Sequence, residues 1–429
     1  MRVHLQSLGC RLNEAELETW ARQFRQRGLR IAGEDEAADL VVVNTCAVTD
    51  EAVRKSRKLL RRVQRENPRA RLVVSGCAAS LPDTLPADAG IDLLVPNTVK
   101  DRLVEIAAAE LALPLMPATA AEPAAAALFA RGRQRGFVKI QDGCRYQCTF
   151  CIATVARGAE RSRTAADVCD DINALAADGI QEIVLTGVHA GGWGGDLGDD
   201  LAGLLATVLR ETDVPRIRLG SVEPWGLSER FWRLFEDRRM MPHLHLPLQS
   251  GADSVLKRMA RRCKLAEFEQ LAARAREAAP GFNLTTDIIV GFPGETDAEW
   301  RQTMDAVERI GFGHLHIFAY SPRAGTRAAT MPDQVTADTK RARGRELHAL
   351  GQRLKRAALE RQVGRTLPVL IEGPFNDPSA AGDGAGYTPN YLLVRIRGAG
   401  SGELINRIEA VRIEGVNDGG DALLGSIAG

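Results

Sequence analysis

The sequence contains no apolar run that approaches the roughly 20 residues a helix needs to cross a bilayer. Its first residues, Met1–Leu5, lack the long apolar region of a signal peptide and are typical of the start of a strand. The formal net charge is only +1, so no global field points to a polyanionic partner. We therefore expect a cytoplasmic protein without a membrane partner.

The chain also lacks the signs of a disulfide scaffold. Disulfide-dense proteins are mostly small and secreted, whereas clustered thiols in an intracellular chain more often bind metal or do chemistry. With 429 residues, of which 45% are hydrophobic and 26% charged, this is an ordinary globular composition. That length is enough for two or three domains of roughly 150 residues. The eight cysteines therefore favour metal binding or catalysis.

Positive charge is concentrated in two stretches. Arg54 to Arg71 contains nine basic residues and one acidic residue, and Lys340 to Arg365 contains nine basic and two acidic residues. Such faces are compatible with a nucleic-acid partner. Solvated faces of two amphipathic helices would give the same pattern.

The first 113 residues alternate short β-branched runs with helical patterns. The strands are predicted at Val3–Ser7, Leu40–Asn44 and Leu72–Ser75, and a helical pattern follows each of the first two. This alternation predicts an α/β domain with a parallel sheet at 1–113. Residues 114–130 are rich in Ala and Pro, which predicts a linker.

Residues 131–364 repeat the strand–helix alternation six times. The strands are predicted near Phe137–Gln141, Glu182–Thr186, Arg216–Gly220, His243–Leu248, Leu284–Val290 and His314–Phe318. Six such units predict a partial or full TIM-like barrel of parallel strands, with its chemistry at the C-terminal strand ends.

The chain changes character in residues 365–429. Short strands are predicted at Val369–Ile371, Tyr391–Ile396 and Ala410–Ile413, separated by loops rich in Gly, Asp and Asn. This pattern predicts a small antiparallel β-barrel of the OB-like kind.

The strongest chemical motif is a loop with three cysteines. Cys144, Cys148 and Cys151 follow the strand Phe137–Gln141 directly. Three thiolates so close together can hold one cubic iron–sulfur cluster, and because such clusters normally take four cysteines, one iron stays open for a small ligand. The alternative is a structural zinc site completed by a distant residue.

A second set of cysteines is spread along the first domain. Cys10, Cys46 and Cys77 each lie within three residues of the C-terminal end of a predicted parallel strand. Such ends meet at one edge of a sheet, where open α/β folds bind ligands, so the three could hold a second cluster. Alternatively they are small buried hydrophobic residues. Cys169 and Cys263 lie in helical patterns and are interpreted as structural.

The cysteine loop carries a resemblance to a known superfamily. The segment Gly143–Cys151, with the sequence GCRYQCTFC, resembles the signature loop of radical S-adenosylmethionine enzymes. The resemblance implies a [4Fe–4S] cluster whose open iron chelates S-adenosylmethionine and whose electron cleaves it to a 5′-deoxyadenosyl radical. In such enzymes the protein positions the cofactor and excludes water.

Both cysteine sets together resemble the methylthiotransferase family over nearly the whole chain. The segment Gly386–Tyr391 resembles a TRAM domain, a small barrel associated with RNA binding. Further segments resemble the MtaB branch, which acts on threonylcarbamoyladenosine: Leu8–Asn13, Leu185–Val188, Leu246–Gly251, Val255–Met259 and Tyr320–Thr326. Two departures from this pattern are Cys263, where an aromatic residue or His is expected, and the weakly apolar Ala153–Ala156.

The resemblance implies a reaction, cofactors and partners. It implies methylthio transfer to carbon 2 of threonylcarbamoyladenosine in the tRNA anticodon arm, with two [4Fe–4S] clusters and S-adenosylmethionine. An electron donor such as flavodoxin or ferredoxin and a monomeric state are also expected. Neighbouring branches act on isopentenyladenosine in tRNA or on an aspartate of a ribosomal protein. A non-catalytic, zinc-stabilised RNA-binding protein is the alternative of a different class.

The resemblance further suggests residues around S-adenosylmethionine. Most candidates end the predicted barrel strands, and Arg163 follows the cysteine loop with Arg157 and Arg161. The candidates are Thr186, Gly187, Ser221, Glu223, Gln249, Ser250, Gly291 and Arg163. Ordinary strand-end turns and a solvated helix start are the alternatives. Beyond the cysteines no catalytic residue is assigned, and the seven histidines form no metal-ligand or Ser/His/Asp pattern.

Overall fold

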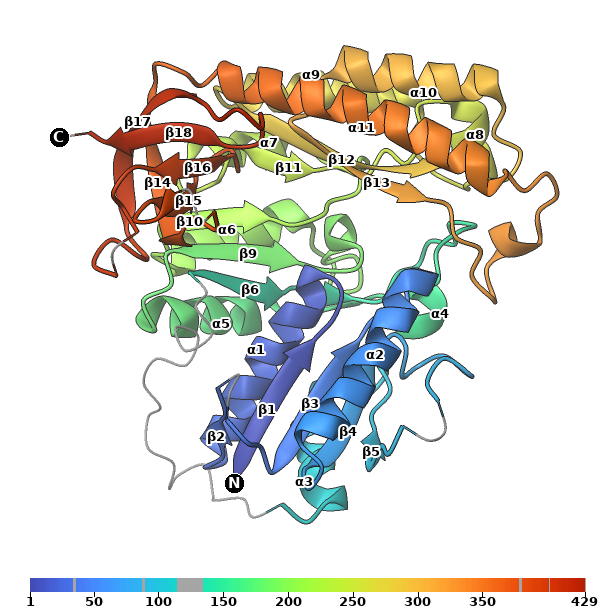
Figure 1. The fold of residues 1–429 in the computed structure, drawn as a ribbon, viewed down its shortest axis with the longest axis vertical. Helices are drawn as coiled ribbons and strands as arrows, with labels where there is room; N and C mark the ends of the chain where they lie inside the picture. The colour runs from blue at the N-terminus through green and yellow to red at the C-terminus, as the bar shows by residue number, and fades with distance from the viewer. Residues whose placement is uncertain (34–35, 87–88, 114–133, 378–379, 401, 429) are drawn as a thin grey trace.

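The computed structural model describes three successive parts of the chain (Figure 1). The described residues are 1–33, 36–86, 89–113, 134–377, 380–400 and 402–428. The predicted linker 114–130 lies outside them. In these ranges no helix combines the length and apolar character needed to cross a membrane.

The N-terminal part is a five-stranded parallel sheet in the order β2-β1-β3-β4-β5. The strands are β1 (Arg2–Ser7), β2 (Arg30–Ile31), β3 (Leu40–Thr45), β4 (Arg71–Gly76) and β5 (Leu93–Leu94). Helices α1 (Arg11–Gln26) and α3 (Leu103–Glu110) pack on one face and α2 (Asp50–Glu66) on the other, so each face has its own apolar core. The predicted parallel α/β domain is present.

Helix α2 shows why the first basic stretch folds as it does. Thr49 caps the helix through a bond from the Ala52 amide, and Val53, Leu60 and Val63 face the sheet at helical spacing. The basic side chains therefore point outward. The exposed ones are Arg54, Lys55, Lys58, Arg61, Arg62 and Arg65.

The central part is a half-barrel of six parallel strands. They are β6 (Arg135–Lys139), β9 (Glu182–Thr186), β10 (Arg216–Leu219), β11 (His243–His245), β12 (Asn283–Val290) and β13 (His314–Ala319). β6, β9 and β10 form one sheet and β11, β12 and β13 another, joined by bridges such as Ser221 to His245. No pairing of β6 with β13 exists among the described residues, so the predicted barrel is the partial form.

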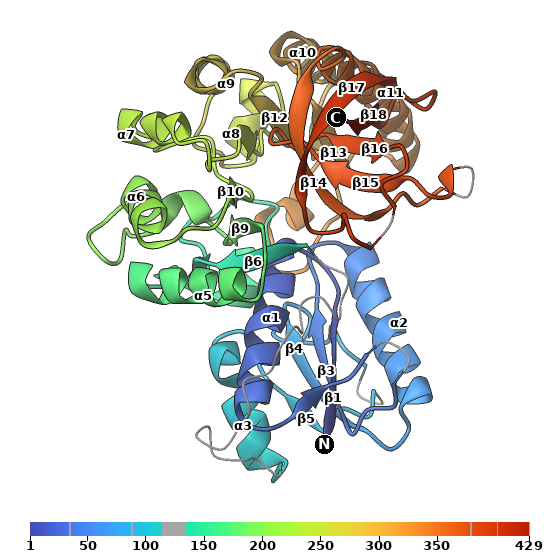
Figure 2. The ribbon, with the colours of Figure 1, turned by 90° about the vertical axis from the view of Figure 1, so that its left-hand side faces the viewer.

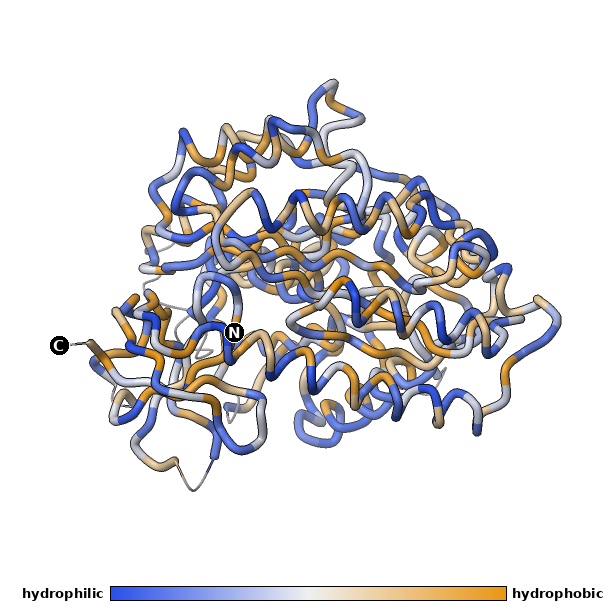
Figure 3. Tube along the Cα trace, turned by 90° about the horizontal axis from the view of Figure 1, so that it is seen from above, coloured by the Kyte–Doolittle hydropathy of each residue, from blue (hydrophilic) through white to orange (hydrophobic). Residues whose placement is uncertain are grey.

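Helices cover the outside of the half-barrel and α1 lies along its β6 edge. The outer helices are α5 (Ala165–Ala177), α6 (Leu201–Glu211), α7 (Glu229–Arg233), α8 (Asp253–Arg258), α9 (Leu265–Ala278), α10 (Asp297–Ile310) and α11 (Ala337–Glu360). Hydrophilic and hydrophobic residues alternate along these helices (Figure 3), as amphipathic packing requires. At the β6 edge the Phe137 amide donates to Glu18 of α1 at 2.9 Å.

The C-terminal part is a closed barrel in the order β14-β15-β16-β18-β17 (Figure 2). Its strands are β14 (Thr366–Pro374), β15 (Gly384–Tyr387), β16 (Leu393–Ile396), β17 (Ile408–Val416) and β18 (Leu423–Ile427). Neighbours are antiparallel except β16 and β18, which pair in parallel. The short glycine-containing strands β15 and β18 were not predicted, because runs such as Gly-Ala-Gly-Tyr carry little strand signal.

A loop of the small barrel is anchored in the base of the half-barrel. The Tyr391 hydroxyl accepts bonds from Arg11 (2.7 Å) and Arg135 (2.8 Å). The guanidinium of Arg218 lies 4.7 Å from the centre of the same ring and donates to the Pro389 carbonyl at 2.9 Å. Tyr391 thus contacts all three parts of the chain at once. The predicted strand began at Tyr391, but the observed strand β16 begins at Leu393, and Tyr391 lies before it at φ 65°.

Candidate functional site

The loop of Cys144, Cys148 and Cys151 lies between the short strand β7 (Gln141–Asp142) and helix α4 (Ala153–Arg157). It folds back tightly, since the Cys144 amide donates to the Gly158 carbonyl at 3.2 Å. Gly143 has φ 72°, and a side chain there would overlap the Ala159 carbonyl. The spacing of the three cysteines is therefore held by a turn that only glycine permits at that position.

The sulfur atoms of this loop receive polar contacts. The backbone amides of Tyr146 and Ala153 each donate at 3.4 Å, to Cys144 and Cys151 respectively. Arg261 Nη1 approaches the Cys148 sulfur at 3.9 Å. Donors of this kind stabilise thiolates that ligate iron and tune cluster potentials.

Burial acts in the opposite direction in the absence of a metal. It raises the pKa of the Cys144 thiol to about 12 and that of Cys151 to about 11, and the neighbouring cysteines add to the effect. Thiols in this position become ligands only when a bound metal displaces the proton. The described residues contain no group of three His, Cys, Asp or Glu side chains arranged to hold a single metal ion. Three thiols in one loop, with backbone amides and Arg261 donating to their sulfur atoms, are the kind of donor set that holds an iron–sulfur cluster.

The second cysteine set comes together at one edge of the N-terminal sheet. Cys10, Cys46 and Cys77 follow β1, β3 and β4, which are adjacent strands. Burial raises the pKa of Cys46 to about 11, and the charges of Cys77 and Cys10 add to it. Gly9 has φ 124°, and a side chain there would contact the Cys46 sulfur at 3.0 Å. Asn97 Nδ2 lies 3.9 Å from the Cys77 sulfur.

The two cysteine sets face each other across the boundary between the first two parts of the chain. Ala156 of α4 packs in one apolar cluster with Cys77 and Ala47, and its carbonyl accepts a bond from Asn97 at 2.7 Å. The charge of Cys77 also contributes to the raised pKa of Cys151. Helix α4, which directly follows the cysteine loop, therefore packs beside the sheet-edge cysteine Cys77.

A buried ion network fixes this arrangement. Arg157 Nη1 lies 3.0 Å from both Glu16 and Asp142, and its Nη2 donates to Asn13 at 2.9 Å. Glu16 also bonds Lys100 at 2.7 Å. Burial alone would raise the pKa of Glu16, but Lys100 and Arg157 hold it well below its ordinary value. Arg157, which was considered for a phosphate or carboxylate partner, is thus fully engaged inside the protein.

The predicted strand-end residues divide into two groups. Thr186, Gly187 and Glu223 lie near the cysteine loop. Gln141 holds this region together: its side chain donates to the Gly143 carbonyl at 2.7 Å and accepts from the His189 amide at 2.8 Å. A side chain at Gly187 would meet Gln141 at 3.0 Å.

Glu223 has the most perturbed environment of this first group. Burial raises its pKa, although His189, whose Nε2 lies 3.7 Å away, opposes the effect. Its charge in turn contributes to the raised pKa of Cys144. Ser221, two residues earlier, makes a β-bridge to His245.

The second group is turned toward the outer helices. The hydroxyl of Ser250 lies 3.1 Å from Thr303 of α10. Gly291, at φ 73°, lies against Lys340 of α11, and Gln249, at φ 75°, bridges to β12. Arg163 bonds Asp171 of α5 at 2.6 Å. The assignment of these residues to S-adenosylmethionine stays a prediction.

An aromatic cluster beside the cysteine loop was missed by sequence reasoning. The ring of Tyr146 lies 4.7 Å from His189 and 5.5 Å from Trp225, both edge-on. Arg261 lies 4.7 Å from the Trp225 ring centre, and Arg262 lies 5.1 Å from that of Tyr146. Such a cationic and aromatic wall suits a planar, polar ligand. An aromatic residue two positions after the strand-end Glu223 was the available signal.

A second group missed from the sequence lies inside the half-barrel. Four of the seven histidines gather on β11 and β13, namely His243, His245, His314 and His316. The signal was the repeated His-Leu-His, because alternate residues of a strand share one face.

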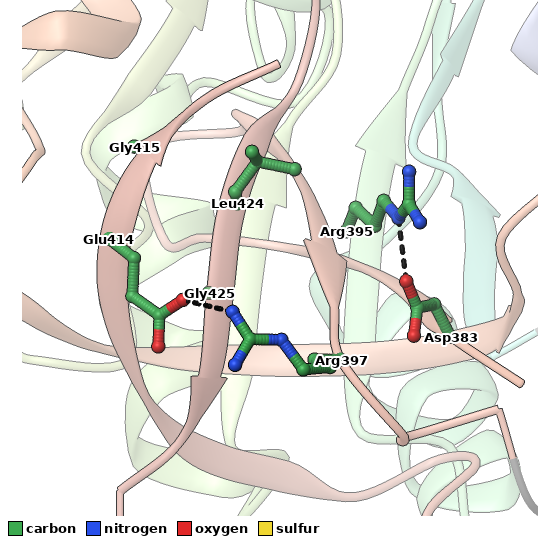
Figure 4. Close-up of a pocket in the computed structure, with 7 residues that line it drawn as sticks. All are labelled: Asp383, Arg395, Arg397, Glu414, Gly415, Leu424 and Gly425. Carbon is green, nitrogen blue, oxygen red and sulfur yellow. Dashed lines mark hydrogen bonds and ion pairs between the residues drawn. The ribbon is translucent and has the colours of Figure 1, made fainter. Parts of the chain in front are cut away.

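A cavity of about 300 Å³ lies on the small C-terminal barrel (Figure 4). Two ion pairs cross it, Arg395 with Asp383 at 2.6 Å and Arg397 with Glu414 at 2.7 Å. Both arginines are thus neutralised within the barrel, and the cavity is separate from the cysteine site.

Comparison with known families and proteins places these features in context. Residues 2–95 match an uncharacterized protein family, UPF0004, and residues 138–307 match the radical SAM superfamily. The chain is 34% identical to the threonylcarbamoyladenosine tRNA methylthiotransferase MtaB of Bacillus subtilis, over 96% of this chain and 93% of that protein. The Thermotoga maritima protein of the same name is 32% identical, with 96% of each chain covered.

A differently named relative is nearly as similar. The tRNA-2-methylthio-N(6)-dimethylallyladenosine synthase of Bacillus subtilis is 32% identical over 96% of this chain and 83% of that protein. Among solved structures, the radical S-adenosylmethionine methyltransferase TsrM of Kitasatospora setae has a TM-score of 0.58 and 17% identity, covering 76% of this chain and 77% of that one. That likeness concerns the fold.

Proposed function

The chain belongs to the radical S-adenosylmethionine methylthiotransferase family, and we propose that it adds a methylthio group to carbon 2 of threonylcarbamoyladenosine beside the tRNA anticodon. Membership brings S-adenosylmethionine and one [4Fe–4S] cluster with it. It also argues against the non-catalytic, zinc-stabilised alternative. The relatives named for the threonylcarbamoyladenosine reaction support this choice of substrate.

The observation that carries the proposal is the packing of Cys77 against Ala156 of the helix that follows the cysteine loop. We assign Cys144, Cys148 and Cys151 to the radical cluster and Cys10, Cys46 and Cys77 to a second [4Fe–4S] cluster. When bound, these groups supply an electron that cleaves S-adenosylmethionine to a radical and a sulfur site from which methylthio is transferred. The packing of Ala156 on Cys77 supports this assignment, because radical and sulfur must reach one carbon.

The chain's own residues hold and shield this space. The network around Arg157 fixes α4 against α1, and its side chains are at most 4% exposed, so little water reaches them. The ring of Tyr146, which belongs to the loop itself, packs edge-on against Trp225 at 5.5 Å. Exclusion of water protects a reactive radical from side reactions.

The tRNA would be held by exposed basic residues. Helix α2 lies below the half-barrel in Figure 1, and the side chains that it exposes are mostly basic. The start of α2 is fixed there by Asp50, which pairs with Arg323 and accepts from the Ser321 hydroxyl at 2.8 Å. Phosphate contacts from such a face would position the anticodon arm, and the target base would be displaced into the site.

The direct test is nucleoside mass spectrometry of tRNA from cells with and without the gene. We expect methylthio-threonylcarbamoyladenosine to disappear in the deletion strain and to return with the intact gene. Loss of methylthio-isopentenyladenosine instead would overturn the proposed substrate. Unchanged tRNA would favour a ribosomal-protein aspartate.

A second measurement tests the cofactor assignment. The protein purified anaerobically should contain close to eight irons per chain, which is two clusters of four. A content near four would remove the second cluster from the proposal. Flavodoxin or ferredoxin should supply the electron in the same assay, and the chain should elute as a monomer.

Isopentenyladenosine tRNA is the second candidate substrate. The observation in its favour is the 32% identity to a dimethylallyladenosine synthase, which nearly equals that of the other relatives.

Limited proteolysis would test the proposed division into domains at 1–113, 131–364 and 365–429, with cleavage expected in the linker at 114–130.

A further inference from the structure

Two strands of the half-barrel carry the same His-Leu-His sequence and flank a common neighbour. His243 and His245 lie on β11, and His314 and His316 lie on β13, with β12 between them. The rings of His245 and His316 are 5.2 Å apart, and those of His314 and His316 are 4.7 Å apart. The four therefore form one group, which we call the histidine face.

This composition is unusual for the interior of a parallel barrel, which is normally packed with branched apolar residues. Thr285 of β12 bonds both His243 (3.2 Å) and His245 (2.9 Å), and Asp287 lies 3.1 Å from His245. Polar groups placed in an interior carry a desolvation cost unless they find partners. Such a lining is therefore expected where a polar ligand enters.

Several donors of the histidine face have no partner inside the protein. The buried Nδ1 of His243 makes no hydrogen bond. His314 and His316 are exposed. Among the described residues their rings pack edge-on against each other, and that of His316 also against His245. Burial lowers the pKa of His316, and burial lowers that of His314 to about 4, so both rings are neutral and can donate as well as accept.

The charge near this face suits an anion. The positive charge of Arg11 adds to burial in lowering the pKa of both His243 and His316. Among the described residues no carboxylate pairs with Arg11. Its recorded contact is with the Tyr391 hydroxyl and ring. Asp287 is the facing carboxylate, and it is already engaged by His245.

The charge of Lys355 adds to burial in lowering the pKa of His314, and that of Arg218, which pairs with Glu182, adds to burial in lowering the pKa of His243. The face is thus flanked by cations and offers several neutral donors.

The histidine face continues toward the cysteine site through an aromatic residue. Phe318 lies two residues beyond His316 on the same face of β13, and it is 44% exposed. It is closer to the C-terminal strand end, where the predicted cofactor residues lie. An exposed aromatic ring at such a position can stack on a nucleobase.

We propose that the histidine face, with Arg11, binds the threonylcarbamoyl group on N6 of the substrate base while Phe318 stacks on the base. This inference rests on the proposed function. The threonylcarbamoyl group carries a carboxylate, a hydroxyl and a urea, which Arg11 and the histidine rings can bond. A dimethylallyl group is wholly apolar and would leave these donors unpaired, so the face would select against it.

The test uses two anticodon stem-loops that differ only in carrying threonylcarbamoyladenosine or unmodified adenosine. Their dissociation constants are measured on the full-length, anaerobically reconstituted protein. The wild type should prefer the threonylcarbamoyl stem-loop. His316→Leu should reduce this preference up to about tenfold by weakening that stem-loop alone, the scale expected for loss of one hydrogen bond. It should raise KM more than it lowers kcat.

The matched control is His348→Leu, because His348 is exposed on the outer helix α11. It should leave both affinities unchanged. Phe318→Ala should instead weaken both stem-loops, because both carry the base on which the ring stacks. An unchanged preference in His316→Leu, or unchanged affinity for both stem-loops in Phe318→Ala, in an enzyme that still modifies threonylcarbamoyladenosine, would overturn the inference alone. A wild type that modifies no threonylcarbamoyladenosine would overturn the proposed function as well, so the two failures are distinguishable.

Discussion

The two cysteine sets reach their positions in different ways. Cys144, Cys148 and Cys151 come from eight consecutive residues and depend on one turn at Gly143. Cys10, Cys46 and Cys77 come from three strands and depend on the register of a sheet. The first set is a property of a loop, and the second is a property of a fold. Different perturbations should therefore damage each one.

The largest expected effect distinguishes the two cysteine sets by the reaction step that each one supports. We expect Cys144→Ala to abolish cleavage of S-adenosylmethionine, because a cluster with two protein ligands loses its anchoring. Cys46→Ala should keep cleavage and lose the methylthio product. Each variant should lose about four irons. Assays of 5′-deoxyadenosine and of modified nucleoside, with iron analysis, measure both outcomes. Loss of cleavage in both variants would contradict independent roles.

The next largest effect concerns the buried ion network of Arg157, which holds helix α4 in place. Arg157→Gln should lower the free energy of unfolding by about 3–5 kcal/mol, because it removes the buried cation that pairs with both Glu16 and Asp142. Arg163→Gln is the matched control, since Arg163 pairs with Asp171 while still 27% exposed, and it should cost about 1 kcal/mol or less. Denaturant titration of both variants gives the comparison. Equal costs would contradict the importance of burial.

A smaller effect sharpens the dependence of the loop set on one turn. Gly143 and Gly158 have nearly the same φ, 72° and 76°, but only Gly143 would bring a side chain against backbone. Gly158→Ala should therefore cost about 1–3 kcal/mol from backbone strain alone, since φ 76° with ψ −155° is a conformation almost confined to glycine. Gly143→Ala should cost about 1–3 kcal/mol more, because its side chain would also overlap the Ala159 carbonyl. Thermal unfolding and iron content should both show the difference. A Gly143→Ala variant that retains its iron would show that the loop can relax.

The smallest effect concerns the surface around the sheet-edge set. Arg61→Gln on α2 should weaken tRNA binding a few-fold and reduce the salt slope by about one. Arg353→Gln on α11, which covers the outside of the half-barrel, should change neither. Binding titrations at several salt concentrations distinguish the two helices. Equal losses would place tRNA across both.

Much of the fold could be predicted from the sequence because its signals are local. The strand Leu40–Asn44 carries a continuous β-branched run. Val3–Ser7 and barrel strands such as β10 and β11 alternate apolar and polar residues, and the helices between the strands carry helical spacing. The short strand Gly384–Tyr387 escaped prediction because its stability comes from its neighbours in the barrel. The parallel pairing of β16 with β18 is likewise a feature of closure.

The candidate site likewise combines features that are local in the sequence with features that depend on tertiary packing. The sequence alone determined the loop of Cys144, Cys148 and Cys151, because its geometry depends on residues within one turn. Only the tertiary structure decided that Arg157 is an internal ion partner and that Tyr391 joins three parts of the chain. It also decided that two distant His-Leu-His strands share one inner face. Contacts between residues far apart in sequence depend on how whole elements pack, and no local pattern encodes that packing.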